Sequence, residues 1–91
     1  MRGGIGVIGL ALALAGATAA SAQTQQELDW CFKRDFGPEQ KIQGCTAVVR
    51  SQQLPAARRA DAHASRGDAY RWKGDLDRAM ADYGEAIRLN P

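Results

Sequence analysis

The sequence has one histidine and only two cysteines, so it has few of the side chains that most often act in catalysis or bind metal ions. Catalysis needs a positioned set of acid, base or nucleophilic groups. His63 lacks such partners. Asp61 is too close in sequence to face it across a helix, and no serine is well placed. A zinc site would need four ligands, and His63 is the only addition to the two thiols. With no Gly-rich phosphate loop either, we expect a protein that is not an enzyme and that binds no cofactor or metal.

An excess of charge of one sign is also missing. The chain has 12 basic and 10 acidic residues, a net charge of +2, and the two signs are interspersed. Such a balance gives no basic footprint for nucleic acid and no basic face for an anionic membrane. No segment alternates between apolar and polar residues with period two, so we expect no β-sheet.

The one long apolar run lies at the N-terminus. Met1-Arg2 is a short positive start, residues 5–20 are uncharged and rich in Ala, Gly and Leu, and Ala20-Ser21-Ala22 resembles a cleavage site. This arrangement predicts a signal peptide over residues 1–22. The alternative is an uncleaved anchor, which would need about 20 predominantly apolar residues. We expect cleavage, a periplasmic or secreted bacterial protein, and no stable membrane insertion afterwards.

The remaining sequence predicts an all-α fold. Breaks at Gly37-Pro38, Leu54-Pro55 and Gly74-Asp75 separate the helices, with Gly74 expected in the left-handed conformation and Asp75 as a helix cap. The predicted helices cover residues 27–35, 38–53, 56–73 and 76–89. They pair into two antiparallel hairpins, which we assign to an N-terminal cap hairpin over 23–55 and a second hairpin over 56–91.

The spacing of the two cysteines predicts a disulfide. Cys31 lies seven residues before Pro38 and Cys45 seven after it, so each is roughly 10 Å from the turn on opposite helices of the first hairpin. An exported protein meets oxidising conditions. Closing a loop of this size contributes about 3 kcal/mol in the chain-entropy estimate. Free thiols or intermolecular bonds are the alternatives, and the absence of C-x-x-C argues against redox or haem-attachment chemistry.

The second hairpin carries small and aromatic residues at fixed intervals. These residues are Gly67, Tyr70, Ala79, Tyr83, Ala86 and Pro91. Their spacing resembles the G-x2-Y…A-x3-F…P pattern of the tetratricopeptide repeat family, with Ala60 as the first residue of the repeat. The resemblance implies one helix-turn-helix unit of an α-solenoid. His63 and Arg66 depart from the pattern, since many members carry bulky apolar residues there.

The resemblance also implies packing roles. Gly67 and Ala79 let the two helices approach closely, whereas Tyr70 and Tyr83 fill the space between this hairpin and the next. Ala86 receives the following repeat, and Pro91 ends the last helix. The first hairpin lacks the pattern, because Lys33 falls where Gly67 would be, and we interpret it as a disulfide-linked cap.

The last helix has an apolar stripe and a polar side. The stripe comprises Leu76, Ala79, Met80, Tyr83, Ala86 and Ile87; the polar side comprises Asp77, Arg78, Asp82, Glu85 and Arg88. One repeat cannot bury its apolar face alone. We therefore expect either part of a longer array or self-association through this C-terminal face.

Function follows from the resemblance as an expectation. The family binds proteins or peptides in a groove, which implies a non-catalytic, periplasmic interaction module with a protein or peptide partner. The groove positions would be Asp61, Ala64, Ser65, Asp68, Arg71 and Trp72. Trp72 is the best anchor, although it could instead pack on Lys73 or the cap; the two aspartates argue against a carboxylate clamp. The alternative is a truncated or self-associating structural protein without a groove ligand.

Overall fold

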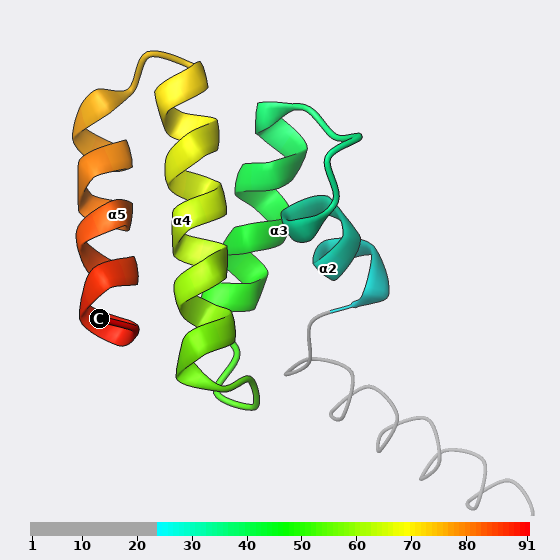
Figure 1. Ribbon diagram of the computed structural model, residues 1–91. Coiled ribbons are helices and arrows are strands. Elements are labelled where there is room, and N and C mark those ends of the chain that lie inside the picture. The colour runs from blue at the N-terminus through cyan, green and yellow to red at the C-terminus, as the bar shows by residue number, and fades with distance from the viewer. Residues whose placement is uncertain (1–23) are drawn as a thin grey trace, which may run out of the picture.

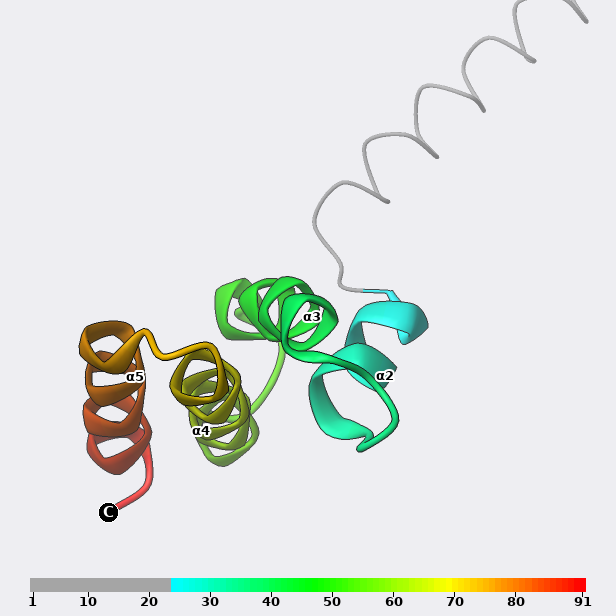
Figure 2. The same cartoon turned by 90° about the horizontal axis from the view of Figure 1, so that it is seen from above.

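Four helices follow one another across the molecule in chain order (Figures 1 and 2). The computed structural model describes residues 24–91, so the expected signal peptide over 1–22 lies outside the described residues. The helices are α2 (Gln25–Phe32), α3 (Pro38–Arg50), α4 (Ala56–Trp72) and α5 (Leu76–Leu89). No strand occurs between residues 24 and 91. The all-α prediction is confirmed, with α2–α3 as one hairpin and α4–α5 as the other.

The first helix begins and ends earlier than the sequence predicted. Thr24 is its N-cap: the Thr24 hydroxyl accepts the Glu27 amide at 3.1 Å, and the Glu27 carboxylate accepts the Thr24 amide at 2.7 Å. This capping box starts the helix at Gln25 rather than 27. At the other end Lys33 is already extended, so the expected end at residue 35 was wrong.

The second helix begins at Pro38 as predicted but ends at Arg50 instead of 53. Ser51 is extended and buried, and it starts the turn into α4. In that turn the Leu54 carbonyl accepts a hydrogen bond from Arg59 Nε at 3.2 Å, and Leu54 packs on the core. Because α3 ends at Arg50, Leu54 can pack on the core, and local sequence patterns do not show this contact.

The turn between α4 and α5 forms as the sequence predicted. Gly74 has a φ of 83°, the left-handed conformation that suits glycine after a helix. Asp75 then caps α5, because its carboxylate accepts the Arg78 amide at 3.3 Å. The two helices of this hairpin run antiparallel and side by side (Figure 1).

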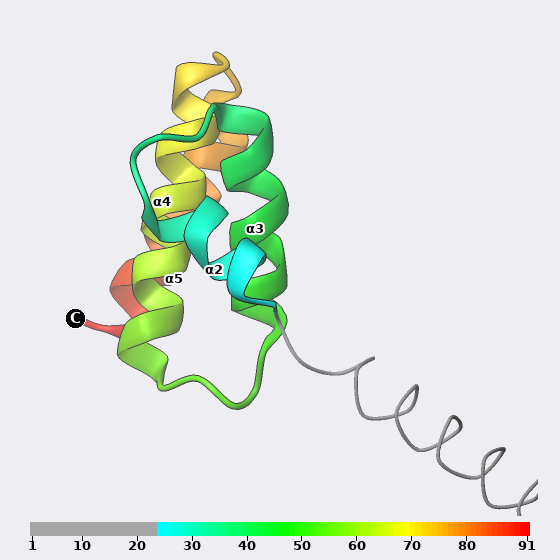
Figure 3. The same ribbon diagram turned by 90° about the vertical axis from the view of Figure 1, so that its right-hand side faces the viewer.

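The core lies where α2, α3 and α4 meet. Cys31 and Cys45 form the predicted disulfide, with Cα atoms 4.6 Å apart, and both are fully buried with Val48 and Ala62. Figure 3 shows α2 lying over α3 and α4, both of which it contacts. The disulfide thus holds α2 against the rest of the molecule. No helix in the described part of the chain is long and apolar enough to span a bilayer.

Candidate functional site

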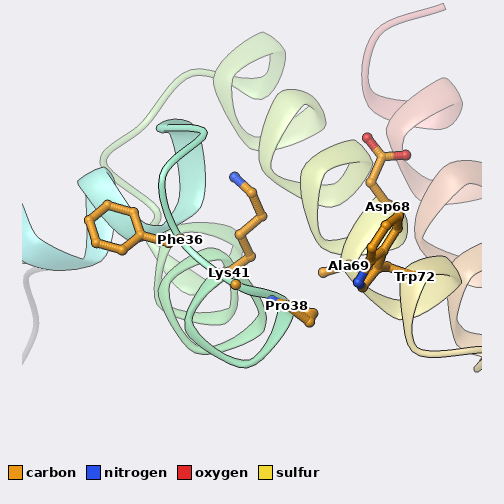
Figure 4. Close-up of a pocket in the computed structure, with 7 residues that line it drawn as sticks. Phe36, Pro38, Lys41, Asp68, Ala69 and Trp72 are labelled. Atoms are coloured by element: carbon orange, nitrogen blue, oxygen red, sulfur yellow. The ribbon is translucent and has the colours of Figure 1, made fainter.

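A pocket opens between the α2–α3 turn and the last turns of α4 (Figure 4). It measures about 350 Å³, near the lower end for ligand pockets, and its lining is mostly apolar. The lining residues are Phe36, Gly37, Pro38, Lys41, Asp68, Ala69 and Trp72. We call this space the cap–repeat pocket, because one wall belongs to the cap hairpin and the other to α4.

The cap wall is fixed by contacts within the first hairpin. The Phe36 ring packs against Trp30, with ring centroids 6.4 Å apart. The Gly37 amide donates to the Gln40 side-chain oxygen at 3.2 Å, which holds the start of α3. Lys41 also lines the pocket, and its ammonium donates to the main-chain oxygens of Lys33 and Cys31 in the cap. This wall is therefore held in place before any ligand arrives.

The α4 wall consists of Asp68, Ala69 and Trp72. Ala69 is buried, whereas 82 % of Trp72 is exposed. Asp68 and Trp72 are four residues apart, so they share one face of α4. Lys73 forms an ion pair with Glu39 at the rim, which ties the end of α4 to the start of α3. The two walls are thus linked.

A buried ionic network lies on the other side of α4. Asp82 of α5 is 4 % exposed and accepts hydrogen bonds from Arg66 Nε and Nη2, both at 2.8 Å. His63 Nδ1 lies 2.9 Å from the same carboxylate. Arg66 Nη1 also donates to the Thr46 hydroxyl of α3 at 3.1 Å. Three helices are therefore joined through one guanidinium.

The network shifts the titration of both ionic partners. Burial alone would raise the pKa of Asp82, but the hydrogen bonds from Arg66 and His63 outweigh it, so the Asp82 pKa is lowered. The Asp82 hydrogen bond raises the pKa of Arg66. Both shifts favour the charged forms, so the pair is ionised at neutral pH.

The sequence interpretation missed this network. The sequence placed Asp82 on the polar side of the last helix, whereas its carboxylate is buried against α4. Arg66 was the available clue, since it stands where the repeat pattern expects a bulky apolar residue. A basic residue at such a position needs an acidic partner nearby. Only the structure shows that Asp82 is this partner.

Comparison with known proteins identifies the second hairpin. The family model of the tetratricopeptide repeat matches residues 60–91. Residues 60–91 are a tetratricopeptide repeat. No curated protein and no solved structure gives a significant match to the chain. The matched segment begins within α4 and includes all of α5, and the cap hairpin lies before it.

The tetratricopeptide repeat gives the chain a general role. Repeats of this family mediate binding to protein partners, so the hairpin is a protein–protein interaction module. Among residues 24–91 no group of three or more His, Cys, Asp or Glu side chains is arranged to hold a metal ion.

Within the repeat, small residues occur where the helices touch. A Cβ added to Gly67 would lie 2.8 Å from the Tyr83 ring and 3.3 Å from the Ala79 carbonyl oxygen. The Tyr83 ring therefore lies inside the α4–α5 hairpin against Gly67, whereas the sequence placed it between this hairpin and the next. Tyr70 is half-buried, with the Arg78 guanidinium 5.7 Å from its ring centroid. Pro91 follows the end of α5 at Leu89.

The predicted groove residues of the repeat do not form one surface. Asp68 and Trp72 line the cap–repeat pocket, and Arg71 is exposed beside them, 3.8 Å from Asp68. Ser65 is used internally, because its hydroxyl donates to the Cys31 carbonyl at 2.7 Å. Asp61 lines a second, shallower hollow of about 190 Å³ between α4 and the end of α5. The residues of this hollow are Ala60, Asp61, Ala64, Ala86, Ile87 and Asn90.

Proposed function

We propose that this protein is a non-catalytic interaction module that holds a segment of a partner protein in the cap–repeat pocket. The observation that carries the proposal is the position of Trp72. Its side chain lines the pocket and is 82 % exposed, so neither Lys73 nor the cap covers it. Exposed tryptophans beside a preformed pocket are frequent anchors of protein interfaces.

The pocket suits an extended segment better than a globular surface. It is small, and its two walls come from the α2–α3 turn and the end of α4. The Trp30–Phe36 contact orders the cap wall, and the Lys73–Glu39 ion pair links the two walls, both without a ligand. A preformed site of this kind loses little conformational freedom on binding. One or two partner side chains would fill the pocket.

Export to the periplasm is part of the proposal. The N-terminal sequence has the features of a cleaved signal peptide. The buried disulfide is consistent with an oxidising compartment. Fractionation of bacteria that express the full sequence should recover the protein in the periplasm or the medium, with a mass that starts at residue 23. Retention of the intact chain in the cytoplasm would refute the assignment.

Binding can be tested with a displayed library of random nonapeptides. Peptides selected on the full-length protein should lose binding to Trp72→Ala. They should keep it with Met80→Ala, which truncates another exposed apolar side chain outside the pocket, and with Glu85→Ala on the outer face. Equal losses in Trp72→Ala and Met80→Ala would remove the pocket from the proposal.

Self-association is a second candidate function, favoured by the exposed apolar residues of α5. Leu76, Met80 and Ile87 are 59 %, 71 % and 66 % exposed and lie along one side of the helix. A second copy could cover them. Sedimentation should then show a dimer that Met80→Glu dissociates, whereas a monomer at all concentrations would exclude this role.

A further inference from the structure

We infer that the cap–repeat pocket recognises a basic side chain of the partner segment, best an arginine. The inference rests on the proposed function and names the chemistry that the pocket selects. Asp68 and Trp72 line the pocket from α4, opposite Pro38 and Lys41, while the Phe36 ring points away from them (Figure 4). An aromatic face next to a carboxylate attracts a cation through two interactions: the ring quadrupole and the opposite charge of the carboxylate.

The Asp68 carboxylate is accessible for this role. Its side chain is 61 % exposed, and it accepts one hydrogen bond, from the Tyr83 hydroxyl. That hydroxyl fixes the carboxylate and leaves further acceptor positions open, since a carboxylate has about four. Arg71 lies 3.8 Å away on the same helix, and an exposed pair at that separation is weak. A ligand guanidinium can therefore compete with it.

The two lysines near the pocket have their ammonium groups engaged by other partners. The Lys41 ammonium is bonded to two main-chain oxygens of the cap, those of Lys33 at 2.7 Å and Cys31 at 3.3 Å. The surface of the pocket is almost entirely apolar. Lys73 forms an ion pair with Glu39. Asp68 is the one acidic residue among those that line the pocket.

The apolar lining suits the rest of a basic side chain. An arginine has a long methylene stem, which can lie on Pro38 and Ala69 while its planar head stacks on Trp72. The same contact already exists within this protein. The Arg58 guanidinium lies over the Phe32 ring, 3.9 Å from its centroid. The pocket offers the corresponding aromatic surface without an internal guanidinium on it.

The test compares N-acetyl-arginine amide with N-acetyl-citrulline amide, its neutral analogue of nearly the same shape. Each is titrated into the full-length protein, and the Trp72 indole N–H is followed by NMR, with the other tryptophan, Trp30, as the internal reference. We expect arginine amide to shift the Trp72 signal with a Kd about tenfold lower than that of citrulline amide, from one cation–π contact and one exposed ion pair.

Two aspartate variants make the test specific. Asp68→Asn keeps an oxygen for the Tyr83 hydroxyl but removes the charge, so it should bring the arginine Kd to the citrulline value. Asp61→Asn removes an exposed carboxylate of the same helix that lines the other hollow, and it should preserve the preference. The inference is overturned by equal Kd values for the two amides, by no shift at Trp72, or by a preference that survives in Asp68→Asn.

Failure here is distinguishable from failure of the proposed function. Library peptides that depend on Trp72 but need no basic residue would sustain the binding function and overturn the cation preference. Absence of any Trp72-dependent peptide would refute the function itself. If replacing the arginine of a Trp72-dependent peptide with citrulline weakens binding about tenfold, both are supported.

Discussion

The Arg66 guanidinium and the Asp82 carboxylate meet side by side between α4 and α5, in two hydrogen bonds of 2.8 Å. This bidentate geometry is the strongest form of an arginine–carboxylate contact. The same guanidinium reaches Thr46 of α3 at 3.1 Å. The pair therefore joins the cap hairpin to both helices of the repeat.

Loss of the Asp82 carboxylate should destabilise the fold strongly. In Asp82→Ala the Arg66 charge stays in a largely buried place without its partner, so we expect a loss of about 3 kcal/mol in the free energy of unfolding. Urea unfolding followed by circular dichroism measures it. Glu85→Ala is the control, because it breaks the solvent-facing pair with Arg88 and should leave the midpoint nearly unchanged. Similar midpoints for both variants would contradict the network's role.

Acid should weaken the protein through the same carboxylate. The pKa of Asp82 is lowered in the folded state from its ordinary value of 3.8, so its contribution is present above that value. The contribution is lost as the pH falls through the folded-state pKa, because the unfolded chain then binds more protons. Urea midpoints between pH 5 and 2 should therefore fall more steeply for the natural sequence than for Asp82→Asn. Equal dependence of the urea midpoint on pH in the two proteins would show that Asp82 does not contribute to acid sensitivity. Asp77→Asn is the control, because it changes an exposed residue of the same helix and should leave the pH dependence of the midpoint as in the natural sequence.

Two glycines in helices should respond in opposite directions to alanine. A Cβ at Gly44 would lie 2.5 Å from the Glu27 carbonyl oxygen and 2.7 Å from Trp30 Cβ, so α2 would have to move. We expect Gly44→Ala to cost about 1–3 kcal/mol.

Gly84 is the matched control for Gly44. A Cβ there meets nothing within 4 Å, so Gly84→Ala should gain up to about 1 kcal/mol from helix propensity alone. Thermal melts of the two variants measure both effects. A raised Tm for Gly44→Ala would show that α2 does not pack on α3 as described.

Removal of the disulfide should loosen the cap more than the repeat. Cys31 and Cys45 close a loop with a sequence separation of 14, and losing the bridge should cost about 3 kcal/mol. The Cys31→Ala/Cys45→Ala variant tests this without a reductant. Hydrogen exchange should speed up in α2 and α3 first, because the repeat has its own contacts between α4 and α5. Uniform acceleration across all helices would contradict a separate effect on the cap.

Several features followed from the sequence because they depend on nearby residues. The breaks at Pro38, Pro55 and Gly74, the cap at Asp75 and the pairing of Cys31 with Cys45 were all predicted correctly. The repeat pattern identified the second hairpin, and the family match confirms it. Use of Trp72 as an anchor stays a prediction.

The features that sequence reasoning missed depend on residues far apart in the chain. Asp82 and Arg66 are separated by 16 positions, and Ser65 and Cys31 by 34. Whether a polar residue faces water or a partner depends on what the neighbouring helix presents at that level. A helical pattern gives the face of a residue and not its partner.

The sequence by itself determined the four helical segments, the breaks at Pro38, Pro55 and Gly74, the disulfide and the repeat, since dihedral preferences and short-range spacing suffice for these. Only the tertiary structure decided that Asp82 is buried, that Ser65 is used internally, and that Asp68 and Trp72 share a pocket with Phe36 and Pro38. The reason is physical: burial and charge pairing depend on distances between helices, and packing alone sets those distances.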